Sequence, residues 1–497
     1  MEILNWLEAA NPIQTAFSDE NGSITYGDFI ARAKAVGSAL IEAIPVRRRP
    51  IAVLFERSIS SLVAFFGIIY SGNFYVPIDS SQPFDRVTTI LSQLLPAAIL
   101  RVGDPAPWEA LVQKDYKLIP FDQLCEHAID HAQLAAVKDT ALDIDPLYAI
   151  CTSGSTGIPK AVLISHRSVV DFINVFVDTF GFDENEVFGN QAPFDFDVSV
   201  KDIYSTIYCH ARMHIIPKIC FSMPKQLIDT LNAQRITTVI WAVSAVCIPS
   251  SFNTFSKYAV PLYLKNVLFS GETMPMKQLN IWRKAMPEVR YVNLYGPTEI
   301  TCNCMYYIVD RAFSDTDTLP LGRSFPNEQV FVLNDDGKPI GSGETGEICV
   351  RGTCLALGYY NDEARTRQAF RQNPAHNLFP DPLYFTGDLA SMNDQSEYVF
   401  ASRRDFQIKH MGHRIELGEI ETFAAAIDGI RRVCCIFNEI AGKIVLFYEG
   451  EVEKTAIIAA LKNKLPKYML PNIYTQLEHM PYNKNGKIDR ARLRSMA

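Results

Sequence analysis

The stretch "CTSGSTGIPKAV", Cys151 to Val162, decides how the rest of the chain is interpreted. It holds six consecutive Gly, Ser and Thr residues and then a lone lysine, Lys160. Gly154 and Gly157 permit backbone conformations that other residues avoid, and the hydroxyls and the lysine could hold phosphate oxygens. The stretch is therefore either a surface linker or a phosphate-binding loop.

The flanking segments favour the phosphate-binding loop. "YAIC" (148–151) has the apolar character of a buried strand, and "HRSVVDFINVFV" (166–177) has helical periodicity. We therefore expect a strand, a loop and then a helix, a context in which backbone N–H groups bind phosphate. The spacing differs from G-x-x-x-x-G-K-[ST], so the loop is not a Walker loop.

The composition is that of a globular protein with several hydrophobic cores. The 497 residues are 48% hydrophobic and 21% charged. The formal net charge of −8 argues against nucleic acid as a general partner, because proteins that bind it are usually basic. We find no signal-peptide pattern and no apolar run of membrane-spanning length. The eleven scattered cysteines form no C-x-x-C pair, so we expect reduced thiols in a cytoplasmic protein with no integral membrane segment.

Most of the chain alternates between strand-like and helix-like segments. "IAVLFE" (51–56) precedes the helix-like residues 58–72, and "YVPID" (75–79) follows them. "ITTVIWAV" (236–243) and "NVLFSG" (266–271) have the pattern of further buried strands. This alternation predicts α/β layers built on largely parallel sheets.

The last third of the chain has a different pattern. "GETGEICVRG" (343–352) and "EYVFASRRDFQIK" (397–409) are typical of antiparallel strands with glycine-bearing turns. Residues 406–497 then combine strands with two amphipathic helices. They are numerous enough to form a small α+β domain with its own core.

Four further motifs occur in a fixed order together with "TSGSTGIPK". They are "NLYGPTEIT" (293–301), "YFTGDLA" (384–390), "RRDFQIKHMGHRIELGEIE" (403–421) and "NKNGKIDR" (483–490). With them, the whole chain resembles the adenylate-forming superfamily, and within it the stand-alone D-alanine:carrier-protein ligases and the adenylation domains of nonribosomal peptide synthetases. The resemblance implies two α/β layered subdomains plus a small β-barrel in residues 1–402, a hinge at 403–405 and a small mobile α+β lid at 406–497.

The resemblance also implies where ATP and Mg²⁺ bind. The nucleotide positions that it assigns are Thr152, Ser153, Gly154, Ser155, Thr156, Gly157, Lys160, Tyr295, Gly296, Thr298, Glu299, Asp388 and Arg403. Among them, Glu299 would hold Mg²⁺, because a carboxylate is a hard oxygen ligand. Asp388 would accept hydrogen bonds from the ribose hydroxyls, and Tyr295 would stack on the adenine.

Lys487, Thr298 and Arg403 are the catalytic positions that the resemblance implies. The first half-reaction brings a carboxylate to the α-phosphate of ATP, and two anions approach more easily when a cation lies between them. Lys487 would supply that charge. On the residues alone, Lys487 could instead be a solvated lysine of the basic C-terminal segment.

The second half-reaction is implied to use the lid. Asp405 lies at the hinge position, and rotation there would exchange Lys487 for the segment that contains Lys409 and Gly412. These two residues would line a tunnel for the phosphopantetheine thiol of a carrier protein.

Asp197, in "FDVSV", matches the aspartate that binds the substrate's α-ammonium group in amino-acid-activating members. Its alternative role is to cap the helix that follows it. By motif alignment, the side-chain pocket comprises Val198, Lys201, Ala242, Leu268, Ser270, Leu294, Cys302 and Asn303. Ser270 and Asn303 could hydrogen-bond a hydroxyl, so serine and alanine are expected ahead of proline.

Three functions stay open at this point. The first is an amino-acid ligase that loads a separate carrier protein, since the chain contains no pantetheine-attachment segment. The second is an acid:CoA ligase, and the third is a binding protein without catalysis. The basic residues Arg403, Arg404, Lys409 and Arg414 are expected to complement an acidic carrier.

Overall fold

The computed structural model describes residues 1–106, 109–154, 159–341, 343–404, 407–439, 441–482 and 488–497. The contacts divide the chain into two compact units. The first unit comprises Met1–Ser80, Leu95–Ile150 and Ala161–Arg404. The second unit comprises Ser81–Leu94, Cys151–Lys160 and Asp405–Ala497.

The first unit contains a nine-stranded sheet that is parallel in its centre. Its strands, in order of pairing, are β15 (Arg323–Ser324), β14 (Met305–Ile308), β13 (Arg290–Tyr295), β12 (Asn266–Ser270), β11 (Thr238–Ala242), β9 (Val187–Asn190), β10 (Arg212–Ile215), β1 (Thr15–Asp19) and β2 (Gly22–Thr25). The pairs at the two ends of the sheet are antiparallel.

A seven-stranded sheet forms the second layer of strands. Its strands, in order of pairing, are β18 (Gly358–Tyr359), β8 (Lys160–Ser165), β7 (Pro146–Thr152), β4 (Phe74–Asp79), β3 (Pro50–Phe55), β5 (Ala98–Arg101) and β6 (Leu118–Pro120). The strands predicted from "IAVLFE" and "YVPID" are its neighbours β3 and β4, which pair in parallel. The predicted α/β architecture is confirmed.

A five-stranded antiparallel sheet completes the strands of the first unit. It consists of β16 (Glu328–Leu333), β17 (Thr345–Gly352), β20 (Pro382–Met392), β19 (Phe370–Gln372) and β21 (Tyr398–Arg403), the last pairing with β20. The sequence resemblance implied a small β-barrel in this part of the chain. The described strands form an open sheet, because their pairings do not close a ring.

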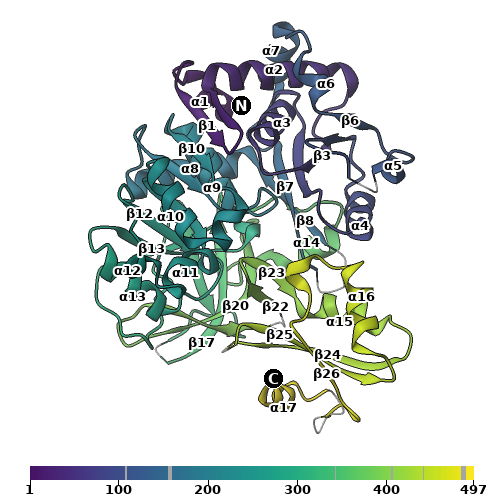
Figure 1. Ribbon diagram of the computed structural model, residues 1–497, viewed down its shortest axis with the longest axis vertical. Helices are drawn as coiled ribbons and strands as arrows, with labels where there is room; N and C mark the ends of the chain where they lie inside the picture. Colours follow the sequence, from purple (N-terminus) through teal and green to yellow (C-terminus); the bar gives the residue numbers. More distant parts are fainter. Residues whose placement is uncertain (107–108, 155–158, 342, 405–406, 440, 483–487) are drawn as a thin grey trace. The chain divides into compact units, whose positions relative to one another are not determined.

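The helices of this unit connect the strands and cover the sheets (Figure 1). They are α1 (Glu2–Ala9), α2 (Tyr26–Ala43), α3 (Ile59–Tyr70), α5 (Glu109–Val112), α6 (Asp122–Cys125), α7 (His131–Thr140), α8 (His166–Phe180), α9 (Val198–Tyr208), α10 (Pro224–Ala233), α11 (Val243–Ser251), α12 (Thr254–Lys257), α13 (Met276–Ala285) and α14 (Glu363–Ala369), with 3₁₀ turns η1 (Lys218–Ser222) and η2 (Thr298–Ile300).

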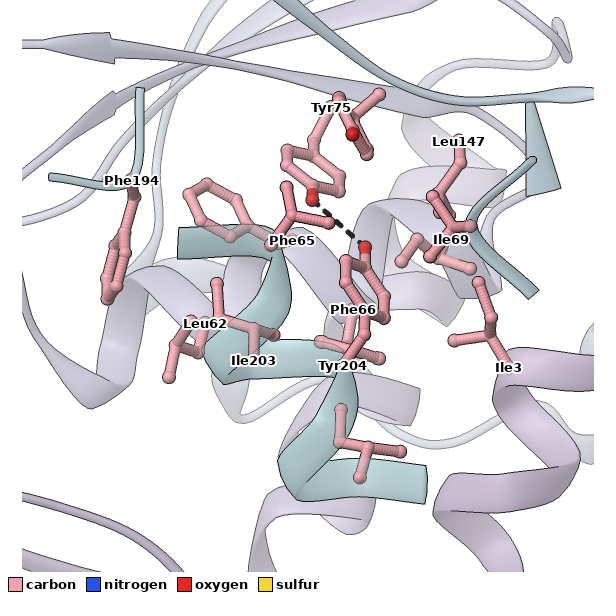
Figure 2. Packing of buried hydrophobic residues seen from close by; sticks show 14 of the residues in the cluster. Ile3, Leu62, Phe65, Phe66, Ile69, Tyr75, Leu147, Phe194, Ile203 and Tyr204 are labelled. Atoms are coloured by element: carbon pink, nitrogen blue, oxygen red, sulfur yellow. Dashed lines mark hydrogen bonds between the residues drawn. The ribbon is translucent and has the colours of Figure 1, made fainter. Parts of the chain in front are cut away.

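Helices α3 and α9 are buried along most of their length, and they contact each other through Phe66 and Tyr204 in the main core. Figure 2 labels the residues Ile3, Leu62, Phe65, Phe66, Ile69, Tyr75, Leu147, Phe194, Ile203 and Tyr204 of this core. The hydroxyls of Tyr75 in β4 and Tyr204 in α9 are 2.9 Å apart, which ties α9 to the seven-stranded sheet. Burying each large side chain contributes about 1.5–3 kcal/mol, so α9 is held firmly at its place.

The second unit combines three segments of the chain. Its helices are α4 (Phe84–Leu94), α15 (Leu417–Ala425), α16 (Lys454–Lys462) and α17 (Arg490–Met496), with the 3₁₀ turn η3 (Lys467–Met469). Its strands form a hairpin of β22 (Gln407–His410) and β23 (His413–Glu416) and a sheet of β24 (Ile430–Asn438), β25 (Lys443–Gly450) and β26 (Ile473–Gln476).

The structure corrects one prediction about the Gly/Ser/Thr-rich loop. The loop leads from β7 into another strand, β8, and helix α8 begins only at His166. The expected strand–loop–helix order was therefore wrong, because Lys160–Ser165 pairs through Val162 and Leu163 with β18. Helix α8 is therefore separated from the loop by the whole of β8.

Candidate active site

The predicted site residues of the first unit gather at one edge of the nine-stranded sheet. The parallel strands β11, β12 and β13 end there at Ala242, Ser270 and Tyr295. Ala242 and Ser270 are direct neighbours in the pairing of β11 with β12. Ligands in open α/β folds bind beyond the carboxyl ends of such strands, so this edge is the candidate active site.

Three of the predicted nucleotide positions form one buried network. The Tyr295 hydroxyl donates to Oδ2 of Asp388 at 2.7 Å, and the Arg403 guanidinium donates to Oδ1 of the same carboxylate. Asp388 and Arg403 face each other across strands β20 and β21. Asp388 is only 1% exposed, and burial raises the pKa of Tyr295 well above its usual value, so the tyrosine is neutral. A carboxylate has about four acceptor positions, which leaves room for the two ribose hydroxyls.

Glu299 lies in the 3₁₀ turn η2, fully buried. Its Oε1 accepts a hydrogen bond of 2.8 Å from the Tyr359 hydroxyl. The turn approaches its neighbours so closely that a Cβ on Gly296 would lie 2.5 Å from the Cα of Asn303. Gly296 is therefore required for the fold of the site, whatever its contact with the nucleotide.

The residues predicted for the side-chain pocket are all buried. Asp197, Val198 and Lys201 come from the start of α9, and the other positions come from strand ends and from the turn after η2. The apolar members Val198, Leu268, Leu294 and Cys302 belong to the main hydrophobic cluster. The residues chosen by motif alignment are therefore buried at the start of α9, at the strand ends and in the turn after η2.

Asp197 does not act as the helix cap that was its alternative role. It occupies the N-cap position of α9 without a capping side-chain hydrogen bond. The Cys302 thiol instead donates to the Asp197 backbone carbonyl at 3.3 Å, which joins α9 to the turn after η2. Cys302 holds a positive φ of 78°, a conformation that is costly for a non-glycine residue and that the surrounding contacts maintain.

Lys201 lies one helical turn after Asp197 and is 1% exposed. Its Nζ donates to Oδ1 of Asn303 at 2.5 Å. Burial lowers the pKa of Lys201, although Cys302, Asp197 and Asp202 oppose the shift. Sequence reasoning placed Lys201 in the pocket without foreseeing its hydrogen bond to Asn303.

Sequence reasoning missed two charged residues beside the pocket. Asp202 is fully buried and accepts a hydrogen bond of 2.8 Å from Asn190, and burial raises its pKa to about 7. Arg57 donates to the side chain and the backbone carbonyl of the same Asn190 at 3.0 Å. Arg57 has no motif around it, so only its position in the fold reveals it.

The two described hydroxyls of the Gly/Ser/Thr-rich loop differ in their hydrogen bonding. The Thr152 hydroxyl is buried without a hydrogen-bond partner among the described residues. The Ser153 hydroxyl donates to the Arg414 backbone carbonyl at 2.7 Å. Ser155, Thr156 and Gly157 lie outside the described residues, whereas Gly154 and Lys160, on either side of them, are described.

The predicted tunnel residues lie in the hairpin of β22 and β23. Lys409 pairs with Arg414, and His410 pairs with His413 at its closed end. The two turn residues, Met411 and Gly412, both have positive φ, of 53° and 79°. This is the pattern of a two-residue type I′ turn, which favours glycine. Asp405 and Lys487 lie outside the described residues.

The expected surface of basic residues needs correction. The Arg403 side chain is only 8% exposed and is paired with Asp388, so it is not available to a partner's surface. Arg404 is half-exposed but lies beside the carboxylates of Asp335 and Glu347. Arg403 is therefore buried within the first unit, and the charge of the partly exposed Arg404 is offset by two carboxylates.

An ion pair that no motif indicated is buried in the second unit. Arg86 of α4 and Glu419 of α15 are 2.6 Å apart, with side chains 5% and 0% exposed. Burial raises the pKa of Glu419, while Arg86 and a backbone hydrogen bond from Gly154 oppose the shift. Nearby, Asp85 pairs with Lys464, and both side chains remain nearly half-exposed.

The two ion pairs are expected to differ sharply in energy. Glu419→Ala would leave Arg86 buried and unpaired, and we expect a loss of about 3–5 kcal/mol in the free energy of unfolding. The double variant Arg86→Met, Glu419→Leu removes both charges and should lose much less. Lys464→Ala, at the exposed pair, should cost at most about 1 kcal/mol. Denaturant titration of these proteins, together with the single variants Arg86→Met and Glu419→Leu, measures the differences, and strictly additive effects of Arg86→Met and Glu419→Leu in the double variant would contradict the pairing.

Membrane-spanning helices, disulfides and metal-binding clusters of side chains are absent from the described residues. No helix of the described residues is long and apolar enough to cross a membrane. None of the eleven cysteines forms a disulfide, as predicted. Among the described residues, no group of three or more His, Cys, Asp or Glu side chains could hold a metal by itself. A Mg²⁺ ion with one carboxylate ligand and phosphate oxygens remains compatible with Glu299.

Comparison with known proteins supports the motif-based resemblance. A family model described as "AMP-binding enzyme" matches residues 6–360. The D-alanine–D-alanyl carrier protein ligase of Bacillus cytotoxicus is 30% identical, and the match covers 100% of this chain and 99% of that protein. Tyrocidine synthase 1 of Brevibacillus parabrevis is 28% identical over 97% of this chain, which spans only 44% of that relative.

A solved structure shows the same fold. The Vibrio cholerae adenylation domain AlmE, determined in complex with glycyl-adenosine-5'-phosphate, superimposes with a TM-score of 0.83. It is 21% identical, and the match covers 99% of this chain and 96% of that one. The family match, the fold and the gathered motif residues together show that the chain belongs to the AMP-binding enzymes, the adenylate-forming ligases that its motifs resemble.

Proposed function

We propose that this protein activates a small amino acid with ATP and transfers it to the phosphopantetheine thiol of a separate carrier protein. The observation that carries the proposal is Asp197, a buried carboxylate at the pocket that does not cap its helix. The α-ammonium group of an amino acid is a cation that a buried carboxylate at this position can bind. The full-length match to D-alanine–D-alanyl carrier protein ligases supports the same reading.

In the first half-reaction, the substrate carboxylate attacks the α-phosphorus of ATP, and pyrophosphate leaves. Tyr295 stacks on the adenine, and Asp388 accepts the ribose hydroxyls while Arg403 keeps its carboxylate in place. The Gly/Ser/Thr-rich loop and Lys160 hold the β- and γ-phosphates. Thr298 and Lys487 stabilise the charge that develops at the α-phosphate. Glu299 would hold Mg²⁺, which neutralises phosphate charge when bound.

In the second half-reaction, the carrier thiol attacks the acyl group, and AMP leaves. We propose that the chain turns at Asp405 between the two steps, so that Lys409 and Gly412 line the path of the thiol. The tight turn at Gly412 gives the pantetheine arm close access to backbone. We expect the reaction to take place in the cytoplasm, because the cysteines are reduced.

Amino-acid-dependent exchange of pyrophosphate into ATP tests the proposal. Among small amino acids, serine and alanine, and behind them proline, are the candidates for the fastest exchange, because the pocket combines Ser270 and Ala242 with apolar side chains such as Val198 and Leu268. Fatty or aromatic acids are expected to support at least about tenfold less exchange. The fastest exchange with such an acid, or acyl transfer to free CoA in place of a holo-carrier, would contradict the proposal.

A further inference from the structure

Lys201 places a positive charge deep in the amino-acid pocket. It lies four residues after Asp197 on α9, so both side chains project from the same face of the helix. The lysine is 1% exposed, and α9 itself is packed against the main core. A lysine is rarely buried to this extent unless something balances its charge.

The described residues balance that charge only in part. An ammonium group has three N–H donors, and the one acceptor within hydrogen-bond distance is Oδ1 of Asn303, at 2.5 Å. Asn303 is a neutral amide and is itself 1% exposed. Two donors of a buried cation thus lack acceptors among the residues that the structure describes.

Among the described residues, neither neighbouring carboxylate, Asp197 or Asp202, forms an ion pair with Lys201. Asp197 is the proposed partner of the substrate's α-ammonium group. Asp202 accepts its hydrogen bond from Asn190, beside Arg57, and burial raises its pKa to about 7, so it is a weak counter-charge. When a substrate ammonium binds, the pocket gains a further positive charge. Lys201 then needs an oxygen acceptor that the protein does not supply.

On the basis of the proposed function, we infer that Lys201 selects amino acids whose short side chain carries an acceptor oxygen, which binds its Nζ. The hydroxyl of serine or threonine, the amide oxygen of asparagine and the carboxylate of aspartate supply this chemistry, and serine and aspartate are the smallest neutral and charged representatives. The carboxylate also offsets the extra positive charge, so aspartate fits at least as well as serine. Alanine and proline carry no such oxygen and would leave the ammonium unsatisfied, which is a strong basis for rejection.

The test measures kcat/KM of pyrophosphate exchange with alanine, proline, serine and aspartate. The wild-type protein is expected to favour serine or aspartate over alanine by about tenfold or more. Lys201→Met replaces the cation with an apolar chain of similar shape. It should lower kcat/KM at least about tenfold for the oxygen-bearing substrate and raise it for alanine, because binding of alanine then leaves no buried ammonium group unsatisfied. Which of serine and aspartate is the better substrate distinguishes the hydroxyl from the carboxylate.

Two further variants keep the test decisive. Lys277→Met removes an exposed lysine of α13 and should change no substrate preference. Asn303→Asp places a carboxylate on the ammonium, so it should weaken the preference for an oxygen-bearing side chain as Lys201→Met does. Thermal shifts with seryl-, aspartyl- and alanyl-sulfamoyl adenosine report binding by folded protein without turnover, and they should show the same change of preference.

The outcomes separate this inference from the proposed function. If alanine or proline is the best wild-type substrate, or if Lys201→Met lowers exchange equally with all amino acids, the selective role of Lys201 is wrong while amino-acid activation stands. If no amino acid supports exchange in the wild-type protein, both fall.

Discussion

Replacing Asp388 with asparagine is expected to lower kcat/KM for ATP by about 10²-fold or more. The carboxylate is 1% exposed, and it receives hydrogen bonds from Tyr295 and Arg403 that fix its orientation. In the proposed complex, its remaining acceptor positions take two ribose hydroxyls. Hydrogen bonds to a charged group contribute about 1.5–3 kcal/mol each, so losing two of them accounts for the expected decrease. Pyrophosphate exchange at varied ATP concentration measures it.

The same substitution should also destabilise the protein, because the buried guanidinium of Arg403 loses its counter-charge. The ribose role is therefore tested with 2′,3′-dideoxy-ATP. The wild-type protein should use ATP far better than the dideoxy nucleotide, and Asp388→Asn should remove most of that difference. A merely structural role for Asp388 would lower both rates by the same factor and leave the ratio unchanged.

Asp381→Asn is a matched control for this test. Asp381 is also buried and also pairs with an arginine, Arg351, immediately before strand β20. Its loss should lower stability while the ratio of ATP to dideoxy-ATP use stays at the wild-type value. An equal loss of nucleotide discrimination in both variants would mean that the ribose contact has been assigned to the wrong residue.

The motifs marked segments that come together in the first unit, but they did not indicate the contacts between their residues. "YGPTE" and "TGD" marked Tyr295 and Asp388 separately, but nothing in the two strings indicates that one donates to the other. That contact depends on how the five-stranded sheet meets the end of β13, and such long-range geometry has no local sequence signal. The same holds for Arg86 and Glu419, which are 333 residues apart in the chain.

The error at the phosphate loop has a local cause. "KAVLIS" is short and apolar, and a run of this length does not distinguish a strand from the start of a buried helix. In the structure it becomes β8 because β18 supplies an antiparallel partner from nearly 200 residues later. If the loop binds the phosphates of ATP as proposed, no helix dipole directly follows it, and Lys160 and the hydroxyls would have to balance more of the phosphate charge.

The buried polar residues of α9 show where composition alone gives the wrong expectation. Lysine and aspartate at consecutive positions usually indicate a solvated helix face, yet Lys201 and Asp202 are both buried. Such charges are tolerated where they bind a ligand or one another, and they are costly otherwise. Their burial is therefore a stronger indication of a binding site than the motif alignment that first pointed to Lys201.

Lys487→Ala is expected to slow adenylate formation by about 10²–10³-fold, the usual effect of removing one group that stabilises transition-state charge. The proposed role concerns only the first half-reaction. Transfer from preformed aminoacyl-adenylate to holo-carrier should therefore stay within about threefold of the wild-type rate. Single-turnover measurements of the two steps separate them.

Lys484→Ala is the natural control, because it removes the same charge from the same short segment. If the positive charge of the segment were what mattered, both variants would slow adenylation equally. If only Lys487 matters, Lys484→Ala should retain wild-type exchange while Lys487→Ala does not. Equal slowing of both half-reactions by Lys487→Ala would also contradict the assignment, since a lysine that serves the α-phosphate has no part in the attack of a thiol on a finished adenylate.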